Sequence, residues 1–139
     1  MNISIVPPDR VAECWEEVAP LLQPAIDRSG GRFLIQDVYH LIRTGDNHLW
    51  VMFEDGIIVA CCTTTFTQYP RKRMLTGQFL GGKKLSQWAY NLDIVLEKWG
   101  RDNGCDGIEL TGRRGWVRVL DKLGWSLTYY ITEKNYGKR

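Results

Sequence analysis

The segment from Arg73 to Trp99 constrains the fold more than any other part of the sequence, because its periodicity changes at a pair of glycines. Residues 74–80 read MLTGQFL, a run with enough alternation to predict a half-buried strand. Gly81-Gly82 then ends the predicted strand, since glycine adopts backbone angles that other residues avoid. From Leu85 onward apolar residues recur every three or four positions, which predicts an amphipathic helix of about four turns.

A strand, a glycine turn and a helix in this order are typical of phosphate-binding sites. The first amides of a helix have no partner inside the helix, and they carry partial positive charge. Lys83 and Lys84 stand at the predicted start of this helix and add two cations. Many helices that bind nothing also follow strands through glycine turns. Both interpretations therefore stay open from the residues alone.

The composition excludes several classes of protein. A chain of 139 residues with 44% hydrophobic residues is large enough for one independent core, so we expect a single domain over residues 1–139. A net charge of +2 argues against a nucleic-acid-binding protein. The four cysteines lack zinc-knuckle spacing, and we find no signal peptide and no apolar run near twenty residues. We therefore expect reduced thiols, no metal, no membrane partner and a cytoplasmic location.

The first half of the chain predicts one strand, two helices and a hairpin. Residues 3–6 form the strand, and Asp9 caps a helix that Pro20 and Pro24 should end or kink near Ala19. A second helix covers residues 35–44 and ends at Gly45. Strands at 48–53 and 57–67 follow, joined through the hairpin signal Asp55-Gly56.

The second half adds a strand at 108–111, a helix that begins near Trp116 and ends at Gly124, and a final strand from Trp125 to Thr132. Strands joined through a helix usually pair in parallel with a right-handed crossover. The sequence therefore predicts an α/β fold: a mixed sheet of an antiparallel meander plus a parallel central pair, with helices on both faces.

This order of elements resembles the GCN5-related N-acetyltransferase (GNAT) superfamily across nearly the whole chain. Residues 99–105, WGRDNGC, are similar to the family's helix end before its fifth strand, and residues 117–125, VRVLDKLGW, are similar to its last-helix signature. The turn GRRGW at 112–116 and the length resemble the small GNAT-like proteins of tailed bacteriophages.

The resemblance implies that the protein binds acetyl-coenzyme A and transfers the acetyl group to an amine. In this family the pantetheine arm lies between the splayed fourth and fifth strands, so the backbone of Gln78, Phe79 and Leu80 would bind it. The pyrophosphate would lie against the segment Gly81, Gly82, Lys83, Lys84, Leu85, Ser86 and Gln87. Here the sequence departs from the family pattern, because its glycines are adjacent and come early.

The catalytic residues depart from the family as well. Many members carry a tyrosine four residues before the glycine of the last-helix signature, and that position is Leu120 here. An amine acceptor must lose a proton before it reacts. Glu109, on the predicted fifth strand, is the candidate base, although an exposed strand carboxylate is the simpler interpretation. Tyr129 or Tyr130 could supply the missing phenol.

A second hypothesis keeps the fold without the catalysis. The altered loop and Leu120 favour a non-catalytic GNAT-fold interaction protein. If it is phage-encoded, as the resemblance to the phage proteins implies, it would act in the host cytoplasm. Such a protein would bind a protein partner through the basic turn of Arg113 and Arg114. Arg71, Lys72, Arg73 and Arg118 could join those arginines in one basic patch, or they could be scattered solvated charges.

Overall fold

The computed structural model describes residues 2–112 and 114–137, and it places five strands in one mixed sheet of order β1-β2-β3-β4-β5. The strands are β1 (Asn2–Val6), β2 (His48–Glu54), β3 (Ile57–Gln68), β4 (Arg73–Gly82) and β5 (Gly107–Leu110). Neighbours from β1 to β4 pair antiparallel, and β4 pairs with β5 in parallel. This confirms the predicted meander with a parallel pair.

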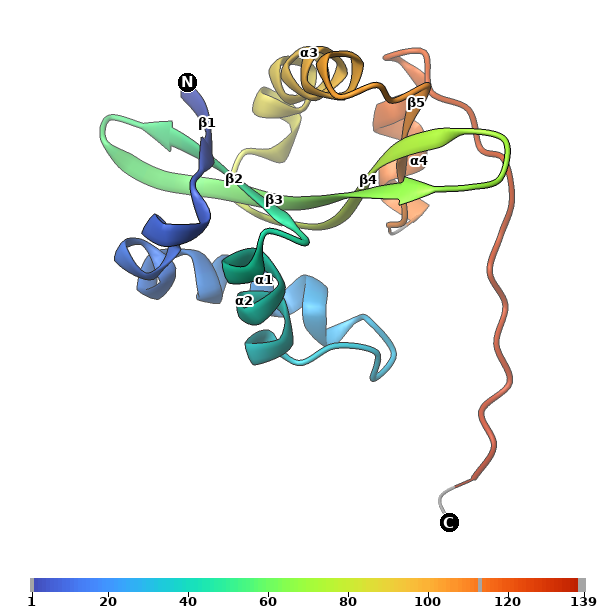
Figure 1. The fold of residues 1–139 in the computed structure, drawn as a ribbon, viewed down its shortest axis with the longest axis horizontal. Helices are drawn as coiled ribbons and strands as arrows, with labels where there is room; N and C mark the ends of the chain where they lie inside the picture. The colour runs from blue at the N-terminus through green and yellow to red at the C-terminus, as the bar shows by residue number, and fades with distance from the viewer. Residues whose placement is uncertain (1, 113, 138–139) are drawn as a thin grey trace.

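Helices cover both faces of the sheet, as predicted (Figure 1). The 3₁₀ helix η1 (Pro8–Glu13), α1 (Trp15–Asp27) and α2 (Ile35–Thr44) lie on one face. The other face carries α3 (Leu85–Asp102) and α4 (Arg114–Asp121). None of the helices in the described ranges is long and apolar enough to cross a membrane.

The turns follow their local sequence. Asp55 and Gly56 have φ values of 53° and 76°, the left-handed pair that a tight hairpin between β2 and β3 requires. Helix α2 starts where the Asp37 carboxylate accepts a hydrogen bond of 2.8 Å from the Leu34 amide, and it ends at Gly45, which has a φ of 85°.

The predicted end of the first helix near Ala19 is wrong, because α1 runs through both prolines to Asp27. Pro20 and Pro24 lie four residues apart on the exposed side of α1, so water can reach the carbonyl groups that lose their partners. The opposite side buries Val18, Leu22 and Ile26. Burial of that apolar stripe outweighs two missing backbone hydrogen bonds.

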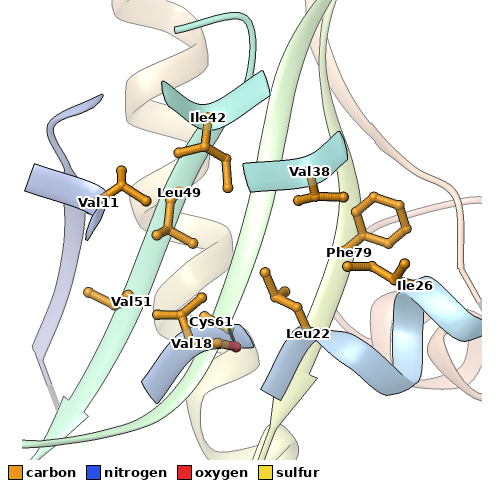
Figure 2. Close-up of a cluster of buried hydrophobic side chains, with 10 residues drawn as sticks. All are labelled: Val11, Val18, Leu22, Ile26, Val38, Ile42, Leu49, Val51, Cys61 and Phe79. Atoms are coloured by element: carbon orange, nitrogen blue, oxygen red, sulfur yellow. Dashed lines mark hydrogen bonds between the residues drawn. The ribbon is translucent and has the colours of Figure 1, made fainter. Parts of the chain in front are cut away.

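The sheet separates two clusters of buried side chains. Figure 2 shows the first, in which Val18, Leu22 and Ile26 of α1 meet Leu49, Val51 and Phe79 of the sheet. The second cluster joins Trp50, Met52 and Leu75 to Trp88, Leu92 and Leu96 of α3. Adjacent Cys61 and Cys62 face opposite clusters, as a strand requires, and all four cysteines are free thiols.

The glycine pair does not end β4, contrary to the prediction. Gly81 pairs with Cys61 and Gly82 pairs with Ala60, so the strand continues through both residues. A Cβ on Gly81 would lie 2.7 Å from the carbonyl carbon of Leu21 and closer still to its oxygen. These glycines therefore let α1 and β3 approach the β4 backbone closely.

The predicted final strand from Trp125 to Thr132 is also wrong as a paired strand. The chain after α4 is extended, but no residue of the described part beyond Leu110 belongs to a strand. Figure 1 shows this tail leaving the body beside the turn between β3 and β4 and ending far from the N-terminus.

Candidate active site

Strands β4 and β5 form a short parallel ladder and then separate. Their register runs from Met74 opposite Gly107 to Gly77 opposite Leu110 and stops there. The Thr111 amide still reaches the Gly77 carbonyl, at 3.4 Å, and β4 continues for five more residues without β5 beside it. The fork in the sheet therefore begins at Gly77.

A β-bulge in β4 coincides with this fork. Thr63 pairs with Phe79 and Thr64 pairs with Gly77, so Gln78 is the extra residue of β4. The Gln78 side-chain oxygen accepts a hydrogen bond of 2.9 Å from Nδ2 of the buried Asn47. The Phe79 amide donates a hydrogen bond of 3.3 Å to the Thr63 hydroxyl of β3.

The backbone of β4 beyond the bulge presents polar groups to the fork. The Lys83 amide donates to the Val59 carbonyl at 2.8 Å, which fixes the alternation of the strand. Because strand residues face alternate neighbours, Phe79, Gly81 and Lys83 direct their amides to β3. Leu80 and Gly82 then face the side that β5 has left. Of the three strand residues expected to bind the cofactor, Leu80 has the orientation that pairing with a ligand needs.

The expected phosphate loop divides between the end of β4 and the first turn of α3. Lys84 has a left-handed φ of 59°, and no side chain caps the amides that follow it. Its Nζ atom forms an ion pair of 2.9 Å with the Glu54 carboxylate of β2. Lys83, Ser86 and Gln87 are exposed. Lys83 is therefore the cation of this turn better suited to meet an anion.

A narrow cavity of about 40 Å³ lies where the fork meets α3 and α4. Its wall includes Gly77 and Leu80 of β4, Ile108 to Leu110 of β5, Trp88 and Asp93 of α3, and Trp116 and Leu120 of α4. The Asp93 carboxylate accepts a hydrogen bond of 2.8 Å from the indole nitrogen of Trp125. Leu120 thus lines the same space as the fork, in the position where the resemblance implies a tyrosine.

Glu109 belongs to a polar group of four side chains, Thr67, Tyr69, Thr76 and Glu109, here called the Glu109 cluster. The Tyr69 hydroxyl donates to Glu109 Oε2 at 2.7 Å, and the Thr76 hydroxyl donates to the same oxygen at 3.2 Å. Since the Thr76 proton is used there, Thr67 donates to Thr76, at 2.6 Å. Among the described residues no donor reaches Oε1.

The Glu109 carboxylate lies on the α1 side of the sheet, whereas the cavity opens toward α3. Leu75 and Ile108 belong to the cluster beneath α3, so the residues after them, Thr76 and Glu109, point to the other face. The carboxylate and the cavity therefore approach the fork from opposite faces of the sheet.

The negative charge of Glu109 changes the pKa of Tyr69. The hydrogen bond to Glu109 raises the pKa of Tyr69 to about 12, with smaller contributions from desolvation and from Tyr129. Removing the phenol proton would place a second negative charge beside the carboxylate. The phenol therefore stays protonated and holds the Glu109 side chain in place.

Sequence reasoning missed Tyr69, Thr76 and Asp93. Tyr69 lies in the turn before β4, forty residues from Glu109, and only the parallel register of β4 and β5 brings the two together. Asp93 falls on α3 among apolar residues, where nothing local marks it. A register prediction that placed Thr76 opposite Glu109 would have indicated the cluster.

Of the residues of the predicted basic patch, Arg73 is held against its own chain. Arg73 stacks on the Phe66 ring, with its guanidinium carbon 4.4 Å from the ring centroid, and its Nε atom donates to the Asn103 carbonyl. Arg71, Lys72 and Arg118 are exposed. Arg113 and the side chain of Arg114 lie outside the described residues.

Comparison with solved structures identifies the fold, although comparison by sequence finds no match. No family model and no curated protein matches the sequence. Solved acetyltransferases match over nearly the whole chain. A ribosomal-protein-alanine N-acetyltransferase from Brucella melitensis biovar Abortus 2308 is 14% identical, with a TM-score of 0.73 over 98% of this chain and 100% of that one.

Two further structures extend this comparison. A predicted acetyltransferase with acetyl-CoA from Clostridium acetobutylicum is 14% identical, with a TM-score of 0.69 over 96% of this chain and 95% of that one. An aminoglycoside acetyltransferase from an uncultured soil metagenomic sample, in complex with sisomicin, is 11% identical, with a TM-score of 0.65 and 96% coverage of both chains. The chain has the GNAT acetyltransferase fold.

Proposed function

We propose that the protein is an acyl-coenzyme A-dependent N-acetyltransferase that moves an acetyl group to an amine. The fork between β4 and β5 is the observation that carries this proposal. Where β5 leaves β4, the backbone of β4 loses its neighbour on that side and needs other hydrogen-bond partners. Here the backbone of Leu80 and Gly82 faces the fork, and an amide-rich ligand such as a pantetheine arm would pair with it.

The residues present fit the chemistry of the cofactor. The backbone groups of the fork suit amides, and the uncapped first turn of α3 with Lys83 suits a diphosphate. Coenzyme A would supply the acetyl group as a thioester. Entry of the arm requires the side chains of Trp116 and Leu120 to move, because a cavity of about 40 Å³ is too small for a pantetheine arm.

Glu109 is the proposed base on the acceptor side of the fork. Tyr69 and Thr76 bond one carboxylate oxygen and so orient the other, Oε1, toward an incoming ammonium group. Oε1 would take a proton from that group, directly or through water, and leave a neutral nucleophilic amine. The structural relatives named above act on a ribosomal-protein alanine or bind an aminoglycoside, so the fold itself does not select the acceptor.

Ligand binding tests the proposal directly. Acetyl-coenzyme A at a hundredfold over its dissociation constant should stabilise the protein by about 2.7 kcal/mol, measured as a shift in thermal unfolding. Lys83→Glu should remove most of this shift, because it places negative charge beside the diphosphate. Lys134→Glu is the matched control on the exposed tail, and it should leave the shift unchanged. An unchanged unfolding temperature at millimolar acetyl-coenzyme A would contradict the proposal.

A non-catalytic interaction protein is the second candidate, and two observations favour it. Leu120 lines the cavity where a proton donor would act, and the glycine pair serves the packing of α1. This candidate predicts no heat on titration with coenzyme A. It also predicts that Arg113→Ala and Arg114→Ala abolish capture of a native protein partner while the fold stays intact.

A further inference from the structure

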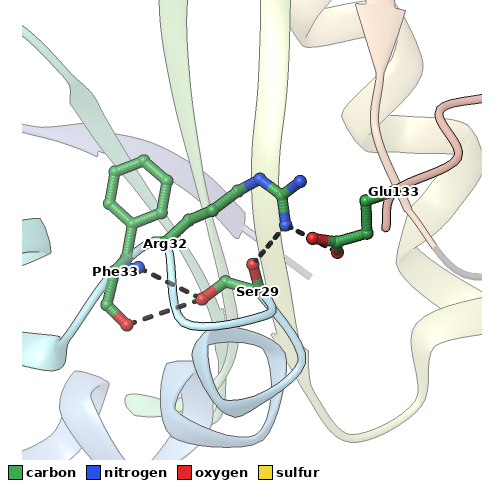
Figure 3. A network of polar contacts seen from close by, with 4 residues as sticks. All are labelled: Ser29, Arg32, Phe33 and Glu133. Carbon is green, nitrogen blue, oxygen red and sulfur yellow. Dashed lines mark hydrogen bonds and ion pairs between the residues drawn. The ribbon is translucent and has the colours of Figure 1, made fainter. Parts of the chain in front are cut away.

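With leucine at position 120, the sulfur atom that departs in the proposed reaction lacks the phenol that the resemblance implies. Tyr129 and Tyr130 are exposed by 67% and 72%, and neither lines the cavity as far as the chain is described. Figure 3 shows where their segment runs, because Glu133 forms an ion pair of 3.2 Å with Arg32. Arg32 belongs to the loop between α1 and α2, which cover the face of the sheet opposite α3. The cavity wall itself offers a different donor.

Thr64 of β3 supplies the only hydroxyl among the described residues of the cavity wall, and its side chain is fully buried. Trp50 Nε1 donates to Thr64 Oγ1 at 2.9 Å, and His48 Nδ1 lies 2.8 Å from the same oxygen. Two nitrogen atoms therefore fix the position of this oxygen. The indole nitrogens of Trp88 and Trp125, which also line the wall, already donate to other acceptors.

Thr64 lies at the narrow end of the fork. It pairs with Gly77, the residue of β4 at which β5 separates. With a diphosphate beside Lys83, at the far end of β4, a bound arm would run along β4 and bring its sulfur end toward Gly77. Glu109 approaches the fork from the opposite face of the sheet. A base for the amine and a donor for the sulfur would then lie on either side of the thioester.

The direction of the single Thr64 hydroxyl proton depends on what it faces. Toward an apolar wall it gains nothing, so the proton is better placed on His48 Nδ1, and the imidazole then carries its own proton on Nε2. A negative sulfur atom would attract the hydroxyl proton instead. His48 Nδ1 would then need a proton to bond the Thr64 oxygen. The imidazole otherwise packs against the rings of Phe66 and Trp99, and the Arg73 guanidinium lies over the same Phe66 ring.

We propose that, in the acetyl transfer on which this inference rests, the Thr64 hydroxyl donates a hydrogen bond to the departing sulfur, in the role that a tyrosine at position 120 would have. The neutral amine nitrogen forms a bond to the thioester carbonyl carbon, and the C–S bond breaks with its electron pair on sulfur. The surplus proton of the nitrogen goes to water. The hydrogen bond from Thr64 stabilises the negative sulfur while the C–S bond breaks.

The thiol pKa of bound coenzyme A tests this role without any amine acceptor. The thiolate absorbs in the ultraviolet, so its titration is read at saturating coenzyme A as a difference from the ligand-free protein. A hydrogen bond to a charged group should lower the thiol pKa by about one to two units from its usual value near 8.5. The charged side chains of the described wall, Asp93 and Glu109, are both negative and would raise that pKa. A lowered pKa therefore indicates a donor.

Two substitutions at Thr64 separate the hydroxyl from the shape of the side chain. Thr64→Val keeps the volume and removes the donor, so the bound thiol should titrate above about pH 8.5, because an apolar cavity disfavours the thiolate. Thr64→Ser keeps the hydroxyl and should keep the lowered pKa. Thr65→Val is the matched control, because the Thr65 hydroxyl donates to the Asp46 carbonyl and by alternation lies on the other face.

Nitrogen NMR of the imidazoles gives a second readout that needs no change at Thr64. The chain contains two histidines, so His40→Gln assigns the His48 signals. We expect His48 Nδ1 to change from unprotonated to protonated when coenzyme A is bound as the thiolate. This readout still decides the question if Thr64→Val fails to fold.

The outcomes distinguish this inference from the proposed function. A wild-type protein that does not bind coenzyme A overturns both. Bound coenzyme A with the same thiol pKa in wild type and Thr64→Val, or with an unchanged His48 Nδ1, overturns the role of Thr64 alone. The Trp116 indole, another donor in the cavity wall, would then be the candidate for that role.

Discussion

Gly81→Ala separates the structural role of the glycine pair from a role in binding phosphate. The added Cβ would meet the Leu21 carbonyl of α1, 2.7 Å from its carbon and 3.5 Å from the Leu22 Cα. These are backbone atoms of a packed helix, so no rotamer change relieves the contact. Helix α1 must move away from β4, although it buries Val18, Leu22 and Ile26.

The expected cost follows from this geometry. Overpacking of a core typically costs 1–3 kcal/mol, and we expect about 3 kcal/mol here because a whole helix must shift. For a domain of this size, that loss lowers the unfolding temperature by about 10 °C. Urea titration and thermal unfolding, followed by tryptophan fluorescence without any ligand, measure both quantities.

The control for this substitution is Gly115→Ala in α4. A Cβ at Gly115 meets nothing within 4 Å, and the residue is helical. Alanine there should leave stability unchanged or raise it by up to about 1 kcal/mol. If Gly81→Ala unfolds within 0.5 kcal/mol of the wild type, taken as about the scatter of surface substitutions, then close packing of α1 does not explain the glycine.

Three further outcomes follow from the site and its surroundings. The raised pKa of Tyr69 predicts that this phenol titrates near pH 12 in ultraviolet absorbance, and Glu109→Gln should return the titration to lower pH. The stability that the neutral phenol provides should be present below about pH 10 and lost as the pH rises toward 12. Burial lowers the pKa of His48, so folding favours the neutral imidazole, and the free energy of unfolding should fall as the pH drops below about 6.5. Urea titrations at pH 5 and pH 7 should show this loss for the wild type and a smaller loss for His48→Gln. If the protein is an acetyltransferase, Leu120→Tyr should raise thiol release from acetyl-coenzyme A by about tenfold or more, because this side chain lines the cavity, whereas Leu123→Tyr, a control outside the cavity wall, should not.

Much of the fold was predictable because local signals and packing agree along most of the chain. The Asp55-Gly56 turn, the Gly45 cap and the apolar stripe of α3 each formed as their residues indicated. The prolines of α1 misled, because their effect depends on which side of the helix meets water. The glycine pair also misled, since its pattern fits a loop and a close helix contact equally well.

The candidate site was predictable only in part, for a different reason. The resemblance to the GNAT family implied the fork between β4 and β5 and a place for Leu120 beside it, whereas no sequence signal indicated the cavity. The Glu109 cluster depends on a register in which Thr76 lies opposite Glu109 and on a turn that returns Tyr69 to the same place. Register is a property of two strands together, so no single stretch of sequence contains it.

The segment after α4 shows what an alternating pattern can and cannot predict. The alternation of Leu127, Tyr129 and Ile131 indicates an extended segment with one apolar side, but it does not indicate what would pack against that side. In its own chain the segment is extended, as predicted, yet it has no neighbouring strand. The pattern therefore predicts the backbone conformation of the segment, but not whether another strand lies beside it.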